Sequence, residues 1–189
     1  MTYRKVWRGS GARNLTCIEE AGLLHNIVMK LPAGSLIVEI GSYEGCSSVI
    51  LASVVDERNQ RLLCVDPLVP FGNGGVPVTE ETPKLFKRNV LDKYKNVTWA
   101  GYGVTSVEAA KTVDEEIDFI FIDAEHTYKA VLEDCTAWLP KLKPGHCVAF
   151  HDFYHEIIGP LIRPAIEEYC VGWELLGGVR SVEVCRKPR

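Results

Sequence analysis

The sequence predicts an α/β protein built on a doubly wound, mostly parallel sheet of seven strands with a C-terminal antiparallel hairpin. Three observations predict this fold. Short apolar runs alternate with amphipathic stretches of helical length, which is the pattern of repeated strand–helix units. The run over 117–123 is almost continuously apolar, as in a central strand covered on both faces. Polar residues follow the apolar runs directly, where the carboxyl ends of parallel strands would bring them together.

In the N-terminal half, strand and helix patterns alternate. The expected elements are a helix over 16–31, a strand over 36–41, a helix over 45–55, a strand over 61–66, a helix over 82–94 and a strand over 96–103. Pro32 and Gly34 stop the first helix, and Pro67 ends the second strand. The first 13 residues carry four basic residues and no acid, which fits either a frayed, solvated arm or a basic flap over the active site.

The C-terminal half continues the alternation. The expected elements are a helix over 106–113 capped by Ser106, a strand over 117–123, a helix over 127–139, a strand over 146–152, a helix over 160–171, and strands over 173–176 and 182–185. We expect Lys143-Pro144-Gly145 to end the helix before the fifth strand, and both prolines of the last helix to lie in its first turn. A Gly-Gly pair joins the last two strands as an antiparallel edge hairpin.

Composition limits the class of protein. A chain of 189 residues, 47% hydrophobic and 24% charged, fits one globular domain, which we divide into an N-terminal arm and helix over 1–34 and a ligand-binding body over 35–189. A net charge of −4 argues against sequence-independent nucleic-acid binding. Neither an apolar stretch of about 20 residues nor a secretory signal is visible. The seven cysteines form no C-x-x-C pair, so we expect a cytoplasmic protein without a disulfide framework.

Residues 68–82 interrupt the alternation of strands and helices. The segment contains three glycines and two prolines, so it cannot form a regular element. Loops of this length in compact domains are commonly lids or binding loops, and this one follows the second strand directly. We therefore expect a lid that orders over the cleft when ligands bind.

The glycine loop after the first strand, Gly41-Ser42-Tyr43-Glu44-Gly45, decides between cofactors. A dinucleotide fingerprint needs a glycine where Tyr43 stands, and Glu44 would repel a phosphate. No Gly-Lys-Ser/Thr follows, so a P-loop is excluded. A cofactor without phosphates fits better, and an acid at the end of the second strand, Asp66, is placed to bond both hydroxyls of a ribose.

The pattern Glu39-x-Gly41-x-x-x-Gly45 resembles motif I of the S-adenosylmethionine-dependent methyltransferases with a Rossmann-like sheet. The stretches 38–48, 118–128 and 150–153 resemble the catechol and macrocin O-methyltransferase-like group. The resemblance covers about 35–186 and implies methylation of a small-molecule hydroxyl. The cofactor residues we predict from it all lie at or just after the carboxyl ends of the first four strands: Glu39, Gly41, Ser42, Tyr43, Gly45, Asp66, Gly103 and Asp123.

The same resemblance implies a divalent metal on an aspartate after the fourth strand and two adjacent residues after the fifth, which here are Asp123, His151 and Asp152. These relatives usually carry a carboxylate where His151 stands. Carboxylates suit Mg²⁺, whereas an imidazole shifts the preference toward Mn²⁺, Fe²⁺ or Zn²⁺, and we predict Mg²⁺ or Mn²⁺. Two alternatives stay open. Consecutive strand residues point to opposite faces, so His151 can miss the metal, and both aspartates can be turn residues that cap helices.

A general base is expected in the turn after the fourth strand. His126 stands three residues after Asp123, the offset at which catechol-type enzymes carry a lysine, and Glu125 is the rival candidate. Histidine suits proton transfer near neutral pH because its ordinary pKa is about 6.5. We expect His25 and His146 to be structural.

A second class of function stays open: a cofactor-binding Rossmann-like module, or a metal-dependent hydroxylase-like relative, without methyl transfer. The expected partner is a small hydroxylated substrate, with neither nucleic acid nor membrane, and the sequence does not separate a phenol from a sugar hydroxyl. A homodimer is also left open.

Overall fold

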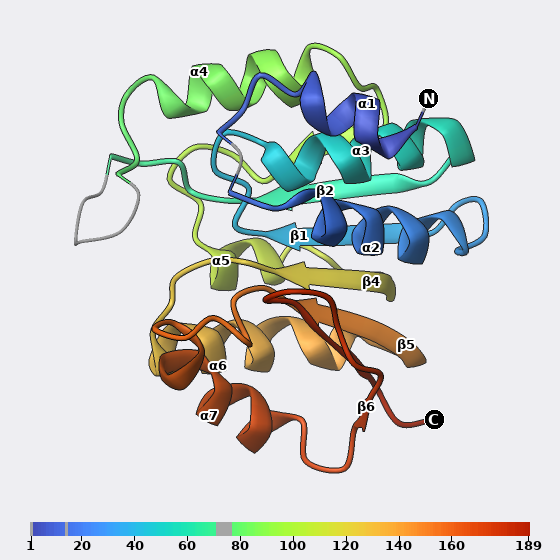
Figure 1. Cartoon of the computed structure of the whole chain (residues 1–189), viewed down its shortest axis with the longest axis vertical. Coiled ribbons are helices and arrows are strands. Elements are labelled where there is room, and N and C mark those ends of the chain that lie inside the picture. The colour runs from blue at the N-terminus through green and yellow to red at the C-terminus, as the bar shows by residue number, and fades with distance from the viewer. Residues whose placement is uncertain (1, 14, 71–76) are drawn as a thin grey trace.

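A seven-stranded sheet forms the middle layer of the computed structural model, which describes residues 2–13, 15–70 and 77–189 (Figure 1). Its strands are β1 (Leu36–Ile40), β2 (Arg61–Val65), β3 (Val97–Trp99), β4 (Ile117–Ile122), β5 (Leu142–Phe150), β6 (Glu174–Leu175) and β7 (Glu183–Arg186). Their order is β3-β2-β1-β4-β5-β7-β6. β1 to β5 are parallel, and β7 runs antiparallel to both β5 and β6. The predicted fold class is confirmed, including the terminal hairpin.

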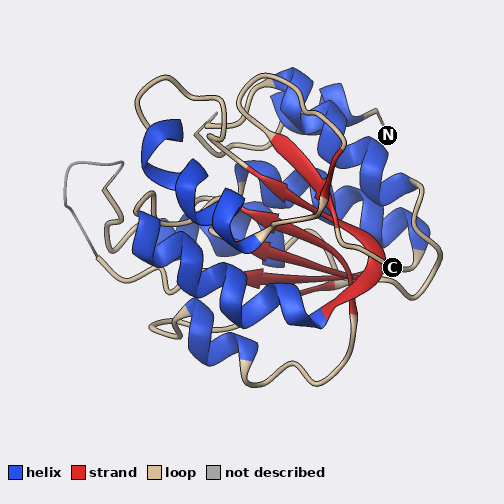
Figure 2. Cartoon of the chain, turned by 90° about the horizontal axis from the view of Figure 1, so that it is seen from below, coloured by secondary structure: helices blue, strands red, loops and turns tan. Residues whose placement is uncertain are grey.

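Helices cover both faces of this sheet (Figure 2). They are α1 (Tyr3–Arg8), α2 (Ile18–Met29), α3 (Cys46–Arg58), α4 (Thr82–Phe86) with its π-helical continuation η1 (Lys87–Leu91), α5 (Ser106–Ala110), α6 (Tyr128–Trp138), the 3₁₀ turn η2 (Leu139–Lys141) and α7 (Gly159–Tyr169). In β4, Ile120 packs into the cluster under α5, α6 and α7, whereas Phe119 and Phe121 pack under α1 to α4. Within the described ranges, none of these helices is long and apolar enough to cross a bilayer.

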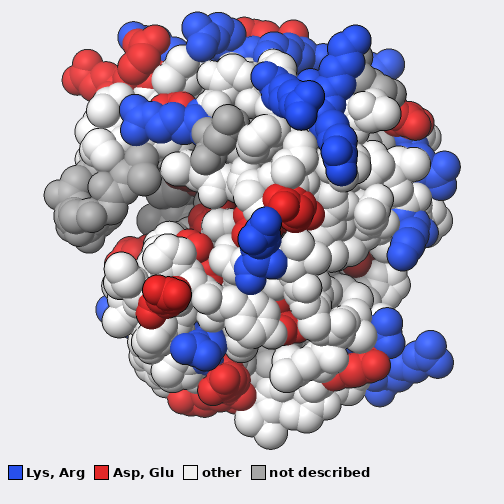
Figure 3. Space-filling model, viewed as in Figure 1, with Lys and Arg blue, Asp and Glu red and all other residues white. Residues whose placement is uncertain are grey.

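The N-terminal arm is folded, so a frayed arm was the wrong expectation. Residues 3–8 form α1, whose Val6 is buried, and Trp7 donates its indole N–H to the carbonyl of Thr16 at 2.9 Å. Arg4, Lys5 and Arg8 of α1 are exposed, and basic side chains gather over this part of the molecule (Figure 3). Charge counting misses this arrangement because two apolar side chains among the basic ones are enough to dock a short helix.

Four features of these elements depart from the sequence-based expectations in an informative way. Thr105 rather than Ser106 caps α5, in a capping box with Glu108. The third strand covers only 97–99 of the predicted 96–103. β5 begins at Leu142 and includes Pro144, because the β4–β5 register is irregular there and a proline is tolerated where the ladder is broken. Pro164 lies inside α7 rather than in its first turn.

A buried acid on α6 gives the fold a predicted pH dependence. Asp134 is 6% exposed, and its burial raises its pKa to about 6, although a hydrogen bond with Ser106 acts in the opposite direction. A carboxyl group with a raised native pKa binds its proton more tightly when folded, so its ionisation above pH 6 costs stability. The cost over this shift is at most about 3 kcal/mol.

Replacing Asp134 by asparagine is therefore expected to raise the free energy of unfolding at pH 8 by about 1–3 kcal/mol. The gain should disappear between about pH 6 and pH 4, where the wild-type carboxyl group becomes protonated in both states. Urea unfolding followed by circular dichroism at several pH values measures it. Glu133→Gln, an exposed neighbour on the same helix, is the control. If the free energy of unfolding of Asp134→Asn changes with pH as it does in the wild type, the prediction is wrong.

Candidate active site

Three loops meet at the carboxyl ends of β1, β4 and β5. The register pairs Ile40 with Ile122 and Ile122 with Phe150, so the residues that follow these strands are neighbours. The backbone confirms this, since Asp123 N donates to the carbonyl of Ile40 at 2.8 Å and His151 N to that of Ile122 at 3.0 Å. The strand order reverses between β1 and β4, which is where parallel sheets bind ligands.

Gly41 is the point at which the β1 and β4 loops touch. Its φ is +88°, and a Cβ atom there would lie 1.9 Å from the carbonyl oxygen of Asp123. We expected this glycine to admit a ligand. In the structure the chain itself makes the close approach, so glycine is required before any ligand binds. Gly45, at φ +93°, is the N-cap of α3, and a Cβ atom there would lie 2.5 Å from the Val90 side chain.

Glu39 lies beneath the glycine loop and is fully buried. Its Oε2 accepts hydrogen bonds from Ser42 Oγ at 2.8 Å and from Ser48 Oγ, and Cys64 Sγ lies at 3.4 Å. Burial raises the pKa of Glu39, and the surrounding hydroxyls only partly offset this. Its Oε1 has no hydrogen-bond partner among the described residues. The side chain thus supports the loop from below, and its contact with the cofactor stays a prediction.

Asp66 holds the same loop from the end of β2. Its Oδ2 accepts the backbone N–H groups of Ser42 at 2.9 Å and Tyr43 at 2.8 Å, and its Oδ1 accepts that of Leu68 at 3.0 Å. Tyr43 has a φ of +46°, which these bonds stabilise. Gly103 N donates to the Pro67 carbonyl at 2.8 Å, which brings the loop after β3 to this position. The predicted cofactor residues are therefore neighbours, and their cofactor contacts stay predictions.

Arg13 is a site neighbour that sequence reasoning missed as an individual residue. Its backbone N–H donates to Glu44 Oε2 at 3.1 Å, and its Nε lies 3.6 Å from Glu44 Oε1. Its guanidinium carbon is 5.9 Å from the centre of the Tyr43 ring. The N-terminal segment therefore lies against the glycine loop, and the negative charge of Glu44 is paired with a cation.

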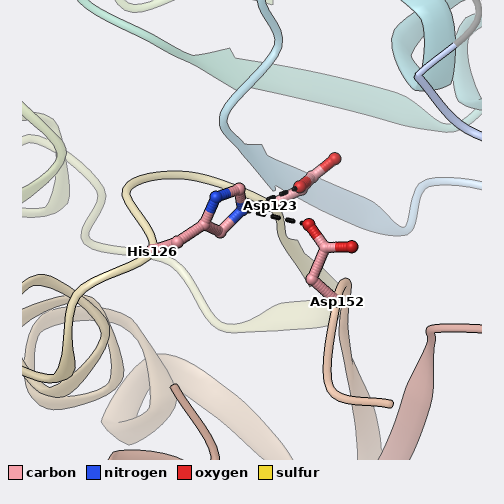
Figure 4. Close-up of side chains that lie close together, drawn as sticks. All are labelled: Asp123, His126 and Asp152. Atoms are coloured by element: carbon pink, nitrogen blue, oxygen red, sulfur yellow. Dashed lines mark ion pairs between the residues drawn. The ribbon is translucent and has the colours of Figure 1, made fainter. Parts of the chain in front are cut away.

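An acid–histidine cluster, Asp123, His126 and Asp152, lies beside this loop (Figure 4). His126 Nε2 is 3.2 Å from Asp152 Oδ2 and 3.7 Å from Asp123 Oδ1. One donor atom from each residue lies within 4.8 Å of the others. Asp152 has a φ of +57°, an uncommon conformation for a side-chain-bearing residue that clusters at functional sites.

His151 contacts the same two acids from the buried side. Its Nδ1 lies 3.2 Å from Asp123 Oδ1 and 3.3 Å from Asp152 Oδ2. The expectation that His151 and Asp152 point to opposite faces does not apply, because β5 ends at Phe150 and the left-handed turn at Asp152 breaks the strand alternation. His151 is only 7% exposed, and its role as a metal ligand stays a prediction.

Charges within the cluster shift its proton affinities. Burial raises the pKa of Asp123, but the charge of His151 and the contact with His126 outweigh it, so the pKa is lowered overall. The contact with Asp123 raises the pKa of His126 more than burial lowers it. Burial likewise lowers the pKa of His151, but Asp123, Asp152 and Glu20 raise it well above its ordinary value. Both rings are therefore held more readily as cations than free histidine.

The two base candidates line one small cavity of about 10 Å³, together with Asp123 and His151. Its other wall is apolar and comes from β4, β5, α6 and α7. Glu125 is exposed and accepts a bond from Thr127 Oγ1 at 3.3 Å. The choice between Glu125 and His126 stays open. His146 lies elsewhere, beside the carbonyl of Asp118 at 2.9 Å, as expected of a structural histidine.

Residues 71–76 of the expected lid lie outside the described residues, so the lid stays a prediction. Its flanks are anchored. Leu68 and Thr82 are each 1% exposed, and Thr79 N donates to Thr82 Oγ1 at 3.0 Å.

Comparison with known proteins identifies the family and the fold. A family model described as a methyltransferase domain matches residues 38–153, which include all three loops. The chain is similar to the O-methyltransferase NovP, with a TM-score of 0.72 and 19% identity over 100% of this chain and 90% of that one. An O-methyltransferase from Bacillus cereus in complex with SAH gives a TM-score of 0.65 and 19% identity over 98% and 90%.

Two further matches extend the comparison. The O-methyltransferase TomG from Streptomyces achromogenes, solved with SAM, gives a TM-score of 0.69 and 16% identity over 99% of this chain and 88% of that one. An uncharacterized protein of Acanthamoeba polyphaga mimivirus is 25% identical over 134 residues, 69% of this chain. The match spans 57% of that curated relative's length. At these identities the structural likeness shows the fold.

Proposed function

From the premise that this chain belongs to the methyltransferase-domain family, we propose that it transfers a methyl group from S-adenosylmethionine to a hydroxyl oxygen of a small molecule, assisted by a divalent metal. The proposal joins the family assignment to the chemistry of the cluster beside the glycine loop.

The contact between the loop of Gly41 and the turn of Asp123 carries the proposal. A Cβ atom on residue 41 would lie 1.9 Å from the carbonyl oxygen of Asp123, so no side chain fits between the two segments. A hydroxyl held at the acid–histidine cluster would therefore lie next to a cofactor held on the glycine loop. Proximity of this kind is a large part of the rate gain in a two-substrate reaction.

The cluster fits a divalent metal. Asp123, His126 and Asp152 would hold it, since two carboxylates and an imidazole suit Mn²⁺ and also Mg²⁺. Nε2 of His126 is buried and has no hydrogen-bond partner among the described residues, although it lies 3.2 Å from Asp152 Oδ2, and such an atom suits a metal ligand. A bound metal would stabilise the anion of the substrate hydroxyl.

The protein's own residues would do the remaining work. Methyl transfer breaks a carbon–sulfur bond and forms a carbon–oxygen bond, so the hydroxyl oxygen must lose its proton. Glu125 and His126 are the groups near the cluster that could accept it. Asp66 would hold the ribose while keeping the loop amides in place.

Replacing Asp66 by alanine is expected to weaken S-adenosylhomocysteine binding by about 30- to 150-fold. The reason is the loss of charge-assisted hydrogen bonds worth roughly 2–3 kcal/mol. Calorimetric titration measures the affinity. Asp56→Ala is a matched control, because Asp56 also accepts two backbone N–H groups, from Lys95 and Asn96, away from the site. Equal affinities in wild type and Asp66→Ala would sink the ribose assignment.

The acceptor is tested with labelled S-adenosylmethionine and a panel of phenols, sugars and matched compounds without a hydroxyl group. Methyl incorporation only into hydroxylated compounds, with Mn²⁺ present, is the expected result. If wild type binds no S-adenosylhomocysteine, the methyltransferase proposal fails.

A further inference from the structure

A buried carboxylate on α2 contacts the acid–histidine cluster from behind. Glu20 is 4% exposed, and its Oε2 lies 3.5 Å from Nε2 of His151. It precedes residues 38–153, which match the family model. We propose that Glu20 is a positioning residue of the active site, acting through His151. The contact between Glu20 and His151 is given by the geometry, whereas its effect on metal binding and methyl transfer rests on the proposed function.

The carboxylate of Glu20 is held rigidly. Its Oε2 accepts the backbone N–H of Cys17 at 2.8 Å, in the capping box of α2. Its Oε1 accepts both the backbone N–H of Ser181 at 3.1 Å and the Ser181 hydroxyl at 2.7 Å. Three hydrogen bonds from two distant segments leave the side chain no freedom to swing away from His151.

These bonds determine which ring nitrogen His151 turns toward the cluster. The Ser181 hydroxyl gives its single hydrogen to Glu20, so its oxygen can only accept from His151 Nε2, which lies 3.4 Å away. Nε2 therefore carries a hydrogen and faces Glu20 and Ser181. Nδ1 is left facing Asp123 and Asp152, and the edge-on Phe121 ring, with its centre 6.2 Å away, supports this orientation.

Fixing this ring fixes the two acids that would hold the metal. Removing a residue that orients the metal ligands without binding the metal typically lowers metal affinity or activity by about 10- to 100-fold. Glu20 contacts His151 in this manner, and Nδ1 of His151 lies 3.2 Å and 3.3 Å from the facing oxygens of Asp123 and Asp152. An isosteric amide at position 20 would offer one acceptor fewer and would loosen the ring.

The neighbouring residue supplies a matched control. Glu19 also joins α2 to the loop before β7, because its Oε1 accepts a bond from Arg180 Nη2 at 2.8 Å. Unlike Glu20, it is exposed, and in the described part of the chain Glu20 rather than Glu19 contacts His151. Glu19→Gln therefore removes a tether between the same two segments without touching the cluster.

The test uses the full chain with Glu20→Gln and Glu19→Gln. Mn²⁺ affinity is measured by electron paramagnetic resonance, S-adenosylhomocysteine affinity by calorimetry, methyl transfer by label incorporation, and the ring nitrogens of His151 by nuclear magnetic resonance. Glu20→Gln is expected to weaken Mn²⁺ binding and lower kcat by about 10- to 100-fold, to shift the His151 ring signals, and to leave cofactor affinity unchanged. Glu19→Gln should match wild type in all four.

Each outcome decides the inference. If Glu20→Gln keeps the wild-type His151 ring signals and the wild-type Mn²⁺ affinity, the inference is wrong. It is also wrong if Glu19→Gln loses as much Mn²⁺ affinity as Glu20→Gln, because Glu20 would then only connect α2 to the loop before β7. If the wild type neither binds Mn²⁺ nor transfers methyl groups, the proposed function fails, and the ring signals still decide whether Glu20 orients His151. If Glu20→Gln does not fold, Ser181→Ala is used in its place. We then expect a smaller shift of the His151 ring signals.

Discussion

Replacing Gly41 by alanine is expected to destabilise the protein by about 2–6 kcal/mol and to abolish cofactor binding in the fraction that folds. A left-handed backbone costs a side-chain-bearing residue roughly 1–3 kcal/mol, and forcing extra atoms into a packed contact costs about as much again. The contact here is backbone, the carbonyl of Asp123 at 1.9 Å from a Cβ atom, so it cannot yield by a rotamer change.

Gly34→Ala separates these two costs. Gly34 has a similar φ of +82°, and a Cβ atom there would find nothing within 4 Å in the described part of the chain. Its replacement should cost only the conformational part, about 1–2 kcal/mol. Urea unfolding measures both variants. Equal destabilisation of the two would mean that the β1 and β4 loops do not constrain each other.

Chelation of divalent metal is expected to abolish methyl transfer while S-adenosylhomocysteine binding stays nearly intact, because the residues predicted to hold the cofactor, apart from Asp123, are not among the proposed metal ligands. His126→Ala should lower the rate of the chemical step by about 10²–10⁴-fold, the usual worth of a general base. Single-turnover kinetics in saturating Mn²⁺ measures this step. His146→Ala, at a histidine bonded to the Asp118 carbonyl, is the control.

The structure makes His126 a candidate both for base and for metal ligand, so Mn²⁺ affinity must be measured in the same variant. Lost affinity with a normal rate at saturating metal would identify His126 as a ligand. A full rate in His126→Ala with a slow step in Glu125→Gln would move the base to Glu125. Activity that survives exhaustive chelation would leave Asp123 and Asp152 as structural turn residues.

Much of the fold follows from local pattern. β1, β4 and the helices after them were predicted within a few residues, because a buried parallel strand is mostly apolar and a turn with glycine or polar residues separates it from the helical stretch that follows. Asp123 and Asp152 were found together because each ends an apolar run, and parallel strands bring such ends to one edge. The predicted start of the fifth strand at residue 146, after Pro144, was wrong, because strand pairing and not local propensity decides where β5 begins.

The rest of the site depends on contacts that no local pattern contains. Glu20 sits in an amphipathic helix, where its spacing from Cys17 predicts at most a helix cap. That its other oxygen meets Ser181 follows from the arrival of the terminal hairpin beside β5. The turn that puts His151 and Asp152 on one side depends on an aspartate with positive φ, where the sequence offers no glycine to signal it.

The pairing of Glu20 with Ser181 joins residues 161 positions apart, so it is among the last contacts a growing polypeptide can make. During synthesis α2 leaves the ribosome long before the β6–β7 hairpin exists. Until β7 pairs with β5, Glu20 lacks its two hydrogen bonds from Ser181, although β1, β4 and their loops can already assemble. The ability to position the cluster would then arise after the core has formed, and contacts this distant in sequence are the slow ones to close.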